Sequence, residues 1–451
     1  MESGYKGRAL DLIKQYDLHV GDRLNAREGE ITLTGVLMPR SELEDDGHIV
    51  LKLDDGYNVG VSIGSLSLQK ISSEEQKAST VRSEESFNPN LPKVSIISTG
   101  GTIASRVDYK TGAVSPALSA SDLYQLVPEL ADIASIRTEI LYSMLSENLD
   151  PEKWSSMAKS IAKHIKDGAQ GVVITHGTDT MGYTGAALSF ALRNLPVPVV
   201  LVGSQRSSDR PSSDASLNLK GAILTAATAP FAEVCVLMHH SSSDTSLAVH
   251  RGTRVRKLHT SRRDAFESVN AFPLARVTDG KLEMLGEYRK RGGTLDVKAT
   301  FDEDVVLIKS FPGVPPDLFD PIIHRDFHGI VLEGTGLGHV PSSLFGQIKR
   351  ATENGLTVVM TSQCIFGRVN MNVYSTGREL LNMGVIPAFD MLPETALVKL
   401  MWVLGQTTDP AKIHEMFLTN LAGEINPRSE YSDGEVDVEC VDKESLKEGS
   451  S

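Results

Sequence analysis

The feature that most narrows the possible folds begins at Lys93, where continuous apolar runs alternate with segments of helical periodicity. Uninterrupted apolar runs are typical of strands buried on both faces of a parallel sheet. These runs are residues 94–98, 172–175, 199–203 and 234–238, followed by 305–309, 330–333 and 358–361. Asp150-Pro151-Glu152 begins a clear helix between them, because Asp is a favoured N-cap and Pro suits the first helical position. The alternation predicts an α/β fold with mostly parallel sheets in two successive units.

The first 92 residues have a different texture. Short stretches of alternating apolar and polar residues, such as 31–34 and 49–53, predict a small β-barrel preceded by a short helix at 7–16. A polar stretch then separates this unit from the α/β part. The predicted organisation is a barrel domain at 1–71, a linker at 72–92, a first α/β domain at 93–298, and a second α/β domain with an acidic tail at 299–451.

Composition excludes several classes of protein. A net charge of −13 over 451 residues argues against a broad nucleic-acid-binding face. No apolar run approaches the ~20 residues of a membrane span, and charged residues interrupt the N-terminus where a signal peptide has its apolar core. The 3 cysteines are far apart and offer neither a disulfide framework nor zinc spacing. We therefore expect a cytoplasmic protein without membrane contact or a metal site.

Two loops at strand ends carry the candidate chemistry. Residues 98–104 follow the first buried run, and residues 175–180 follow the second. Their glycines let the backbone approach a ligand while Thr102 and Thr178 present hydroxyl groups at the mouth of the sheet. Either loop alone has an ordinary structural explanation, because Gly-rich turns flanked by Thr are common in α/β proteins. Two such loops at corresponding ends of one sheet favour a functional site.

A hydroxyl nucleophile needs a base, and a desolvated lysine is one candidate. The basic run 254–259 contains Lys257, but such runs are usually solvated faces, and the residues alone do not select Lys257 from its neighbours. We expect His176 to hydrogen-bond the backbone of its own loop, and residues 391–400 to form ordinary helix core. Other histidines lack metal-ligand spacing: His239, His240, His250 and His259.

Thr-Gly-Gly-Thr-Ile-Ala at 99–104, with Thr-His-Gly-Thr-Asp-Thr-Met at 175–181, resembles the bacterial-type L-asparaginase family. The similarity runs from about Lys93 to Ile425 and implies a two-domain asparaginase-like fold with an amidohydrolase site in the first α/β domain. The resemblance implies four catalytic residues: Thr102 as nucleophile, with Thr178, Asp179 and Lys257 as a linked unit. It also implies four substrate-binding residues: Gly101, Ser146, Glu147 and Gly177.

The implied reaction is acyl transfer, in which Thr102 attacks the side-chain amide of glutamine or asparagine and ammonia departs. Backbone N–H groups around Gly101 and Thr178 would stabilise the oxyanion, and Lys257 would help proton transfer through Thr178. Family members usually carry a tyrosine near the nucleophile, but the corresponding stretch 112–116 has none. Tyr109 is the candidate replacement, and the group that activates Thr102 stays open.

The barrel and linker narrow the resemblance further. A barrel, an acidic linker and an asparaginase-like core are similar to the ammonia-releasing subunits of archaeal amidotransferases that convert Glu-tRNA(Gln) to Gln-tRNA(Gln). The wording of residues 143–148 and 256–264 also resembles those proteins. The resemblance implies a partner, the E subunit of the amidotransferase, which binds tRNA(Gln) and uses ATP and Mg²⁺, in a heterotetramer with two copies of each protein. No cofactor is expected in this chain.

Two other functions remain open at this point. One is a stand-alone cytoplasmic L-asparaginase, for which the barrel would be incidental. The other is a non-enzymatic amino-acid-binding module on the same fold, because a fold does not determine a function. The intact set of two threonines, an aspartate and a lysine favours an enzyme over a binding module.

Overall fold

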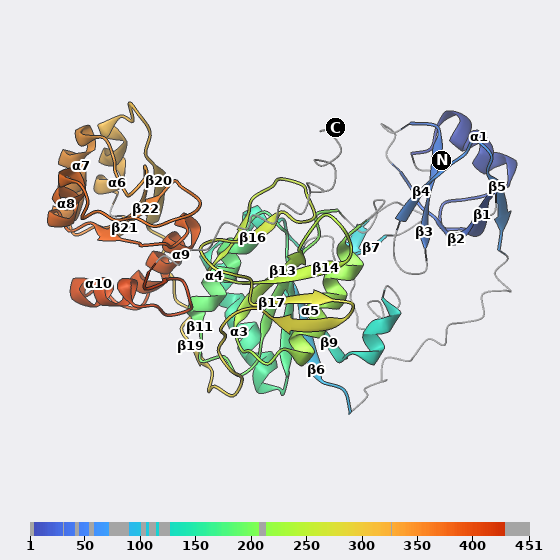
Figure 1. Ribbon diagram of the computed structural model, residues 1–451, viewed down its shortest axis with the longest axis horizontal. Helices are drawn as coiled ribbons and strands as arrows, with labels where there is room; N and C mark the ends of the chain where they lie inside the picture. Colours follow the sequence, from blue (N-terminus) through green and yellow to red (C-terminus); the bar gives the residue numbers. More distant parts are fainter. Residues whose placement is uncertain are drawn as a thin grey trace, which may run out of the picture.

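The computed structural model describes residues 4–29, 31–40, 45–53, 58–71, 90–100, 105–107, 114–116, 127–206, 213–325 and 327–428. Three units follow one another along the longest axis (Figure 1). A small unit from the start of the chain lies at one end, a large α/β unit occupies the middle, and a smaller α/β unit lies at the other end.

The N-terminal unit packs one helix, α1 (Gly7–Gln15), against a five-stranded antiparallel sheet. The strands lie in the order β4-β3-β2-β1-β5: β1 (Arg23–Glu28), β2 (Ile31–Leu37), β3 (His48–Leu53), β4 (Asn58–Ser62) and β5 (Ser67–Lys70). Ala9 and Ile13 of α1 are fully buried in the same cluster as Leu24 and Ile49 of the sheet. The predicted helix and the predicted strands in this region are therefore confirmed.

The large unit is built on an eight-stranded sheet with the order β18-β17-β14-β13-β12-β10-β6-β9. Five neighbouring strands are parallel: β9 (Ser135–Ile140), β6 (Lys93–Ser98), β10 (Gly171–Thr175), β12 (Val199–Val202) and β13 (Val234–His239). Three antiparallel strands extend the sheet: β14 (Ser246–Arg251), β17 (Ala275–Thr278) and β18 (Lys281–Met284). The parallel half agrees with the apolar runs, whereas the antiparallel extension was not foreseen.

Helices cover both faces of the parallel strands, which explains why those strands are apolar throughout. α3 (Pro151–Lys166) and α4 (Met181–Ala191) pack on one face, and α5 (Ala215–Thr228) packs on the other. Neighbouring strand residues contribute to opposite faces, with Val172 in the first cluster and Val173 in the second. The predicted start of α3 is confirmed, because the Asp150 carboxylate accepts the Lys153 N–H at 2.9 Å.

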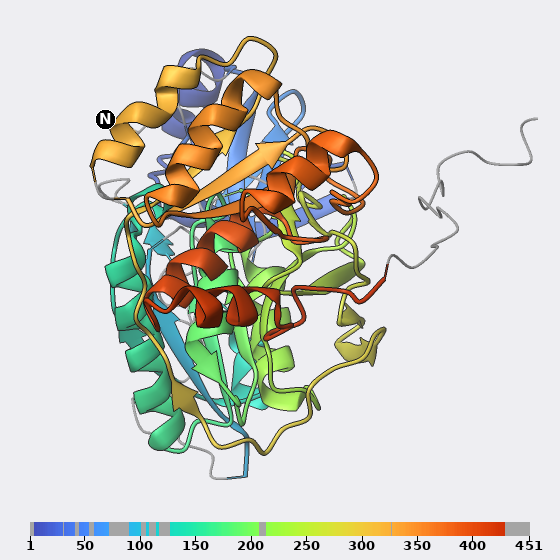
Figure 2. The same ribbon diagram turned by 90° about the vertical axis from the view of Figure 1, so that its left-hand side faces the viewer.

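The C-terminal α/β unit has a four-stranded parallel sheet in the order β20-β21-β22-β23. Its strands are β20 (Val305–Lys309), β21 (Gly329–Gly334), β22 (Thr357–Ser362) and β23 (Ile386–Pro387). Its helices are α6 (Asp320–His324), α7 (Phe345–Glu353), α8 (Ser375–Asn382), α9 (Pro393–Leu404) and α10 (Pro410–Leu418). Figure 2 shows α9 and α10 beside the helices of the large unit, and Trp402 of α9 stacks on Phe190 of α4 at 6.0 Å between ring centroids.

The prediction of ordinary helix core at 391–400 needs a correction. Its apolar residues are buried as expected, but Lys399 in the middle of α9 is also fully buried. Its ammonium group donates to the Glu424 carboxylate at 2.5 Å and to the Thr419 carbonyl at 2.7 Å. Periodicity did not reveal this ion pair because the partner lies 25 residues away in the chain.

Short elements complete the fold. The minor strands are β7 (Ser105–Val107), β8 (Val114–Pro116), β11 (Leu192–Arg193), β15 (Val255–Lys257), β16 (Phe266–Ser268) and β19 (Asp296–Val297). The 3₁₀ turns are η1 (Pro128–Asp132), η2 (Ser146–Asn148), η3 (Pro316–Phe319) and η4 (Ser342–Leu344). Within the ranges that the structure describes, no helix has the length and apolar character needed to cross a membrane.

Candidate active site

Two of the predicted loops meet because their strands are neighbours in the sheet. β6 and β10 run parallel, with Ser98 opposite Thr175, so the residues that follow them leave the same edge. The Thr99 hydroxyl and the Thr99 N–H both donate to the Thr175 carbonyl, at 2.9 and 3.1 Å. The next residue, Gly100, has φ +119°, and a Cβ there would lie 2.1 Å from the Met144 carbonyl oxygen. Only glycine fits this close approach.

The loop that begins at Met144 brings the predicted substrate-binding residues to the same place. Ser146, at the start of η2, is buried beside Gly177, where an added Cβ would lie 2.8 Å from the Ser146 hydroxyl oxygen. The Thr180 hydroxyl donates to the Ser146 carbonyl at 2.7 Å. Glu147, the next residue in η2, is exposed. The structure thus brings Ser146 and Gly177 together and leaves the Glu147 carboxylate open to solvent.

The predicted lysine, threonine and aspartate are in direct contact. The Lys257 ammonium group donates to the Thr178 hydroxyl oxygen at 2.8 Å and to the Asp179 carboxylate at 2.7 Å. The Lys257 side chain is 14% exposed, whereas that of Asp179 is 72% exposed. Because Thr178 accepts a hydrogen bond from Lys257, its own hydrogen is available for a second partner. This arrangement can pass a proton between a reacting group and the amine.

The basic run around Lys257 is not the solvated face that such runs usually form. Lys257 ends β15, which pairs with β16. Arg254 is buried, and its guanidinium group contacts the Asp390 carboxylate at 3.0 Å. Arg256 pairs with Glu394 of α9 at 3.1 Å, and burial raises the pKa of that carboxyl although Arg256 opposes the shift. Each of these arginines therefore has its own acidic partner, whereas Lys257 reaches the strand-end loops.

A third loop, residues 203–206 after β12, also lies against Thr178. A Cβ added to Gly203 would be 2.8 Å from the Thr178 methyl carbon and 2.8 Å from the His176 carbonyl oxygen. In the next two residues, the Ser204 hydroxyl and the Gln205 amide nitrogen are buried atoms without a hydrogen-bond partner among the described residues. Unsatisfied buried polar atoms are costly and often mark a place where a ligand binds. The family resemblance extends over these residues but implied no role for them.

His176 behaves as expected and supports its loop. Burial lowers the pKa of His176 to about 4, so the ring is neutral at neutral pH. Its Nδ1 lies 2.6 Å from the Gly177 carbonyl, and its Nε2 lies 2.8 Å from the Thr184 hydroxyl. Trp154 donates to the same hydroxyl at 3.1 Å, so Thr184 donates onward to Nε2 and the Nδ1–H donates to Gly177. This chain of hydrogen bonds holds the loop before Thr178.

Three predicted site residues lie outside the described residues: Gly101, Thr102 and Tyr109. Their roles stay predictions. The stretch 112–116, in which the expected tyrosine is missing, is described only for β8 from residue 114.

One further group of possible metal ligands lies apart from these loops. Among the described residues, only Asp302, Asp304 and His328 bring three ligand atoms within 4.8 Å of one another. The His328 Nδ1 already contacts the Asp302 carboxylate at 2.7 Å. These groups satisfy one another and do not by themselves indicate a metal site.

Comparison with known proteins agrees with this geometry. Residues 93–289 match the family described as "Asparaginase, N-terminal", and residues 304–417 match the "Glutaminase/Asparaginase C-terminal domain". The thermostable L-asparaginase from Thermococcus kodakarensis superposes with a TM-score of 0.67 at 38% identity, covering 74% of this chain and 100% of that one. L-asparaginase I from Vibrio cholerae gives a TM-score of 0.63 at 29% identity, covering 74% and 99%. Fold and site together define an asparaginase-type amidohydrolase.

The N-terminal unit separates this chain from those asparaginases, because residues 18–71 match the family described as "GatD N-terminal domain". The D subunit of the glutamyl-tRNA(Gln) amidotransferase of Methanothermobacter thermautotrophicus is 52% identical over 428 residues, which cover 94% of this chain and 98% of that protein. Its counterpart from Thermococcus kodakarensis is 51% identical, covering 94% and 99%. The chain belongs to the family of glutamyl-tRNA(Gln) amidotransferase D subunits.

Proposed function

We propose that this chain releases ammonia by hydrolysing the side-chain amide of glutamine, as the amidase component of a glutamyl-tRNA(Gln) amidotransferase. The observation that carries the chemistry is the contact of Lys257 with Thr178 and Asp179 at the mouth of the parallel sheet. The observation that carries the biological setting is the similarity of nearly the whole chain to the amidotransferase D subunits, including the N-terminal unit that the superposed asparaginases do not cover.

In the proposed mechanism, Thr102 is the nucleophile. Its hydroxyl oxygen bonds to the amide carbon, and the tetrahedral oxyanion is stabilised by backbone N–H groups near Gly101 and Thr178. The hydroxyl proton moves to the amide nitrogen, the carbon–nitrogen bond breaks, and ammonia leaves. Water then cleaves the Thr102 ester and releases glutamate. Lys257 and Thr178 act together in moving the protons, and Asp179 holds the ammonium group beside Thr178.

The proposal includes a partner and a location. The E subunit would bind tRNA(Gln), hold ATP and Mg²⁺, activate the glutamyl group and consume the ammonia, in a heterotetramer with two copies of each protein in the cytoplasm. This chain would contribute the amidase site and no cofactor. The name of the relatives, one lettered component of an amidotransferase, supports assembly with another protein.

The test measures ammonia release from glutamine and from asparagine by the full chain alone, with the E subunit, and with the E subunit plus Glu-tRNA(Gln). We expect hydrolysis to rise when the partner and its tRNA are present, because ammonia without an acceptor is wasted. Full activity of the isolated chain on asparagine would favour the stand-alone L-asparaginase instead. The two substrates differ by one methylene, which is worth only ~1–3 kcal/mol in a pocket, so kcat/KM must be compared for both.

The same assay separates an enzyme from a binding module. Thr102→Ala should abolish ammonia release under every condition while leaving the far-ultraviolet circular dichroism unchanged. A module that only binds an amino acid would behave identically with and without this hydroxyl.

A further inference from the structure

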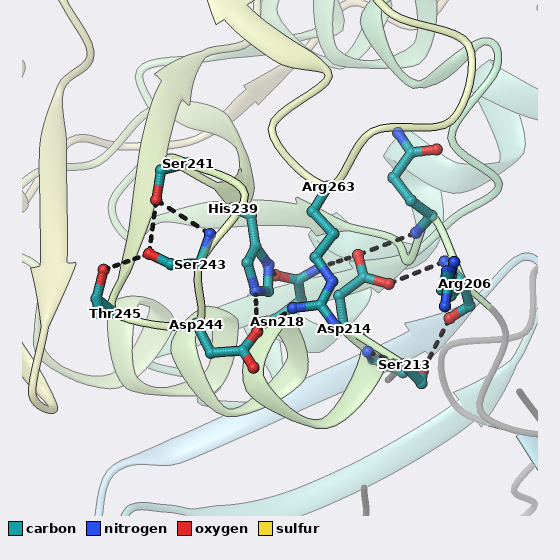
Figure 3. Close-up of polar contacts among 12 residues, drawn as sticks. Arg206, Ser213, Asp214, Asn218, His239, Ser241, Ser243, Asp244, Thr245 and Arg263 are labelled. Carbon is teal, nitrogen blue, oxygen red and sulfur yellow. Dashed lines mark hydrogen bonds and ion pairs between the residues drawn. The ribbon is translucent and has the colours of Figure 1, made fainter. Parts of the chain in front are cut away.

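A buried polar network lies behind the third active-site loop (Figure 3). It begins at Asp214, which is fully buried at the N-cap position of α5 yet makes no side-chain capping hydrogen bond. Its carboxylate turns instead to loop 203–206 and accepts the backbone N–H of Gln205 at 3.0 Å and that of Arg206 at 2.9 Å. Asp214 therefore determines where the backbone of this loop lies.

The next member, Asn218, has only one possible amide orientation. Its Nδ2 lies 3.0 Å from the Gly203 carbonyl and 2.9 Å from the Asp214 carboxylate. Both groups are acceptors only, so the nitrogen must face them and Oδ1 must face the other way. That oxygen lies 2.7 Å from Nδ1 of His239, so Nδ1 must carry a hydrogen.

His239, at the end of β13, faces acceptors at both ring nitrogens. The side chain is fully buried, and its Nε2 lies 3.0 Å from the Asp244 carboxylate. A neutral ring has one N–H and one lone pair, and the lone pair would point at an oxygen on one side. Two N–H groups satisfy both contacts, and the resulting cation is paired with an anion as a buried charge must be. The geometry thus calls for a doubly protonated His239.

Asp244 extends the network to the hairpin that carries Lys257. Its carboxylate also contacts the Arg263 guanidinium group at 2.5 Å. Arg263 lies in the segment 258–265 that joins β15 to β16, and Lys257 is the last residue of β15. The turn around Asp244 is itself braced, because the Ser243 hydroxyl lies 2.9 Å from that of Ser241 and 2.8 Å from that of Thr245 (Figure 3).

We propose that His239 is a positioning residue for amide hydrolysis. Through Asn218 it holds loop 203–206, which lies against Thr178, and through Asp244 and Arg263 it holds the hairpin of Lys257. The proposal rests on the proposed function, because it assigns His239 a role in placing two parts of that site relative to each other. The charged groups around the ring are Asp244 on the turn after β13, Asp214 on α5 beyond Asn218, and Arg263 on the hairpin.

The first experiment replaces His239 with glutamine in the full chain, assayed with its partner. A glutamine amide has one donor nitrogen and one acceptor oxygen, so it can donate to Asn218 or to Asp244 but not to both. We expect kcat to fall on the order of tenfold, because small misplacement of reacting groups slows chemistry strongly, while KM changes much less. His240→Gln is the matched control: its ring contacts Arg276 outside the network, and kcat should stay at the wild-type value.

Asp244→Asn tests the same link from the surface side, where the side chain is 43% exposed and replacement leaves the fold intact. It should lower kcat as His239→Gln does, and the double variant should be no slower than the slower single variant, because both changes break one connection. Multiplied losses, or wild-type kcat in either single variant, would overturn the proposal.

A spectroscopic measurement keeps this proposal separate from the proposed function. In protein with ¹⁵N-labelled histidine at neutral pH, the His239 ring, assigned by its absence in His239→Gln, should give the signals of an imidazolium with both nitrogens protonated. A neutral ring would refute the inference even if ammonia release is confirmed. An imidazolium in a protein that releases no ammonia would instead refute the function.

Discussion

At the level of single residues, the site depends on one amine that serves two oxygens. Lys257 reaches the strand-end loops from its basic run, and it contacts both Thr178 and Asp179. Asp179 is largely exposed, so water weakens its attraction to the ammonium group. The value of the contact therefore lies in placing Lys257 beside Thr178 rather than in stabilising the fold.

Lys257→Met should impair chemistry more than binding. Methionine keeps most of the side-chain volume but removes the group that transfers protons, and we expect kcat to fall by about 10²–10⁴-fold with little change in KM. Steady-state kinetics of ammonia release gives both constants. A raised KM with unchanged kcat would show that Lys257 only binds substrate.

Gly203→Ala should disturb the site without touching a catalytic group. The new methyl would meet the Thr178 methyl carbon and the His176 carbonyl oxygen, each at 2.8 Å. Backbone cannot move aside easily, so we expect about 1–3 kcal/mol of destabilisation together with lower kcat, measured by urea unfolding and by ammonia release. Gly346→Ala is the control, because a Cβ there meets nothing within 4 Å. Wild-type behaviour of Gly203→Ala would contradict the close packing of the loop.

At the level of helices and strands, local signals located the elements, and contacts distant in sequence decided their surroundings. The start of α3 was predicted from three residues because capping is a local interaction. The environment of β15 was not predictable in that way. Arg254 and Arg256 find Asp390 and Glu394, and those acids lie more than a hundred residues further along the chain.

Loss of the α3 cap should have a measurable effect on stability. Asp150→Ala removes the acceptor of the Lys153 N–H, which typically costs about 1 kcal/mol in the free energy of unfolding. Asp150→Asn keeps an acceptor oxygen at the same place and should lose only part of that amount. Chemical unfolding of the three proteins makes the comparison, and equal stability of Asp150→Ala and wild type would contradict the capping role.

Across the molecule as a whole, a buried ion pair joins segments that no local pattern connects. Lys399 of α9 and Glu424 are both completely buried, and α9 packs against α4 of the large unit. Lys399→Met should lower the free energy of unfolding by about 3–5 kcal/mol, because Glu424 would remain buried without its counter-charge. Lys399→Met combined with Glu424→Gln should recover part of the loss. Thermal and urea unfolding measure both, and a harmless single change would refute the prediction.

Stability should also fall in mild acid because of a buried neutral histidine. Burial lowers the pKa of His250 from 6.5 to about 3. Between these values the unfolded chain binds a proton that the folded chain does not, so the free energy of unfolding falls as pH decreases below about 6.5 and is fully present above it. The slope is at most about 1.4 kcal/mol per pH unit for this group. His250→Gln should reduce the loss between pH 7 and pH 5 in urea unfolding, and an unchanged pH dependence would contradict the assignment.

The order of amino acids was enough to establish the kinds of elements and much of the site's composition. Buried strands need apolar side chains on both faces, and loops that approach a ligand closely need glycine, so both are visible in the sequence. The two Gly- and Thr-rich loops could therefore be assigned to one sheet edge, and the family resemblance added Lys257 from a distant segment. Thr102 itself lies outside the described residues, and its role stays a prediction.

Which polar groups meet was settled by the folded arrangement of the chain. The contact of Lys257 with Thr178, the packing of Gly203 on that threonine, and the protonation of His239 all depend on partners from separate strands and helices. Hydrogen bonds and ion pairs act over a few ångströms of space and are indifferent to separation along the chain. For that reason the order of residues named the participants, and the fold selected their partners.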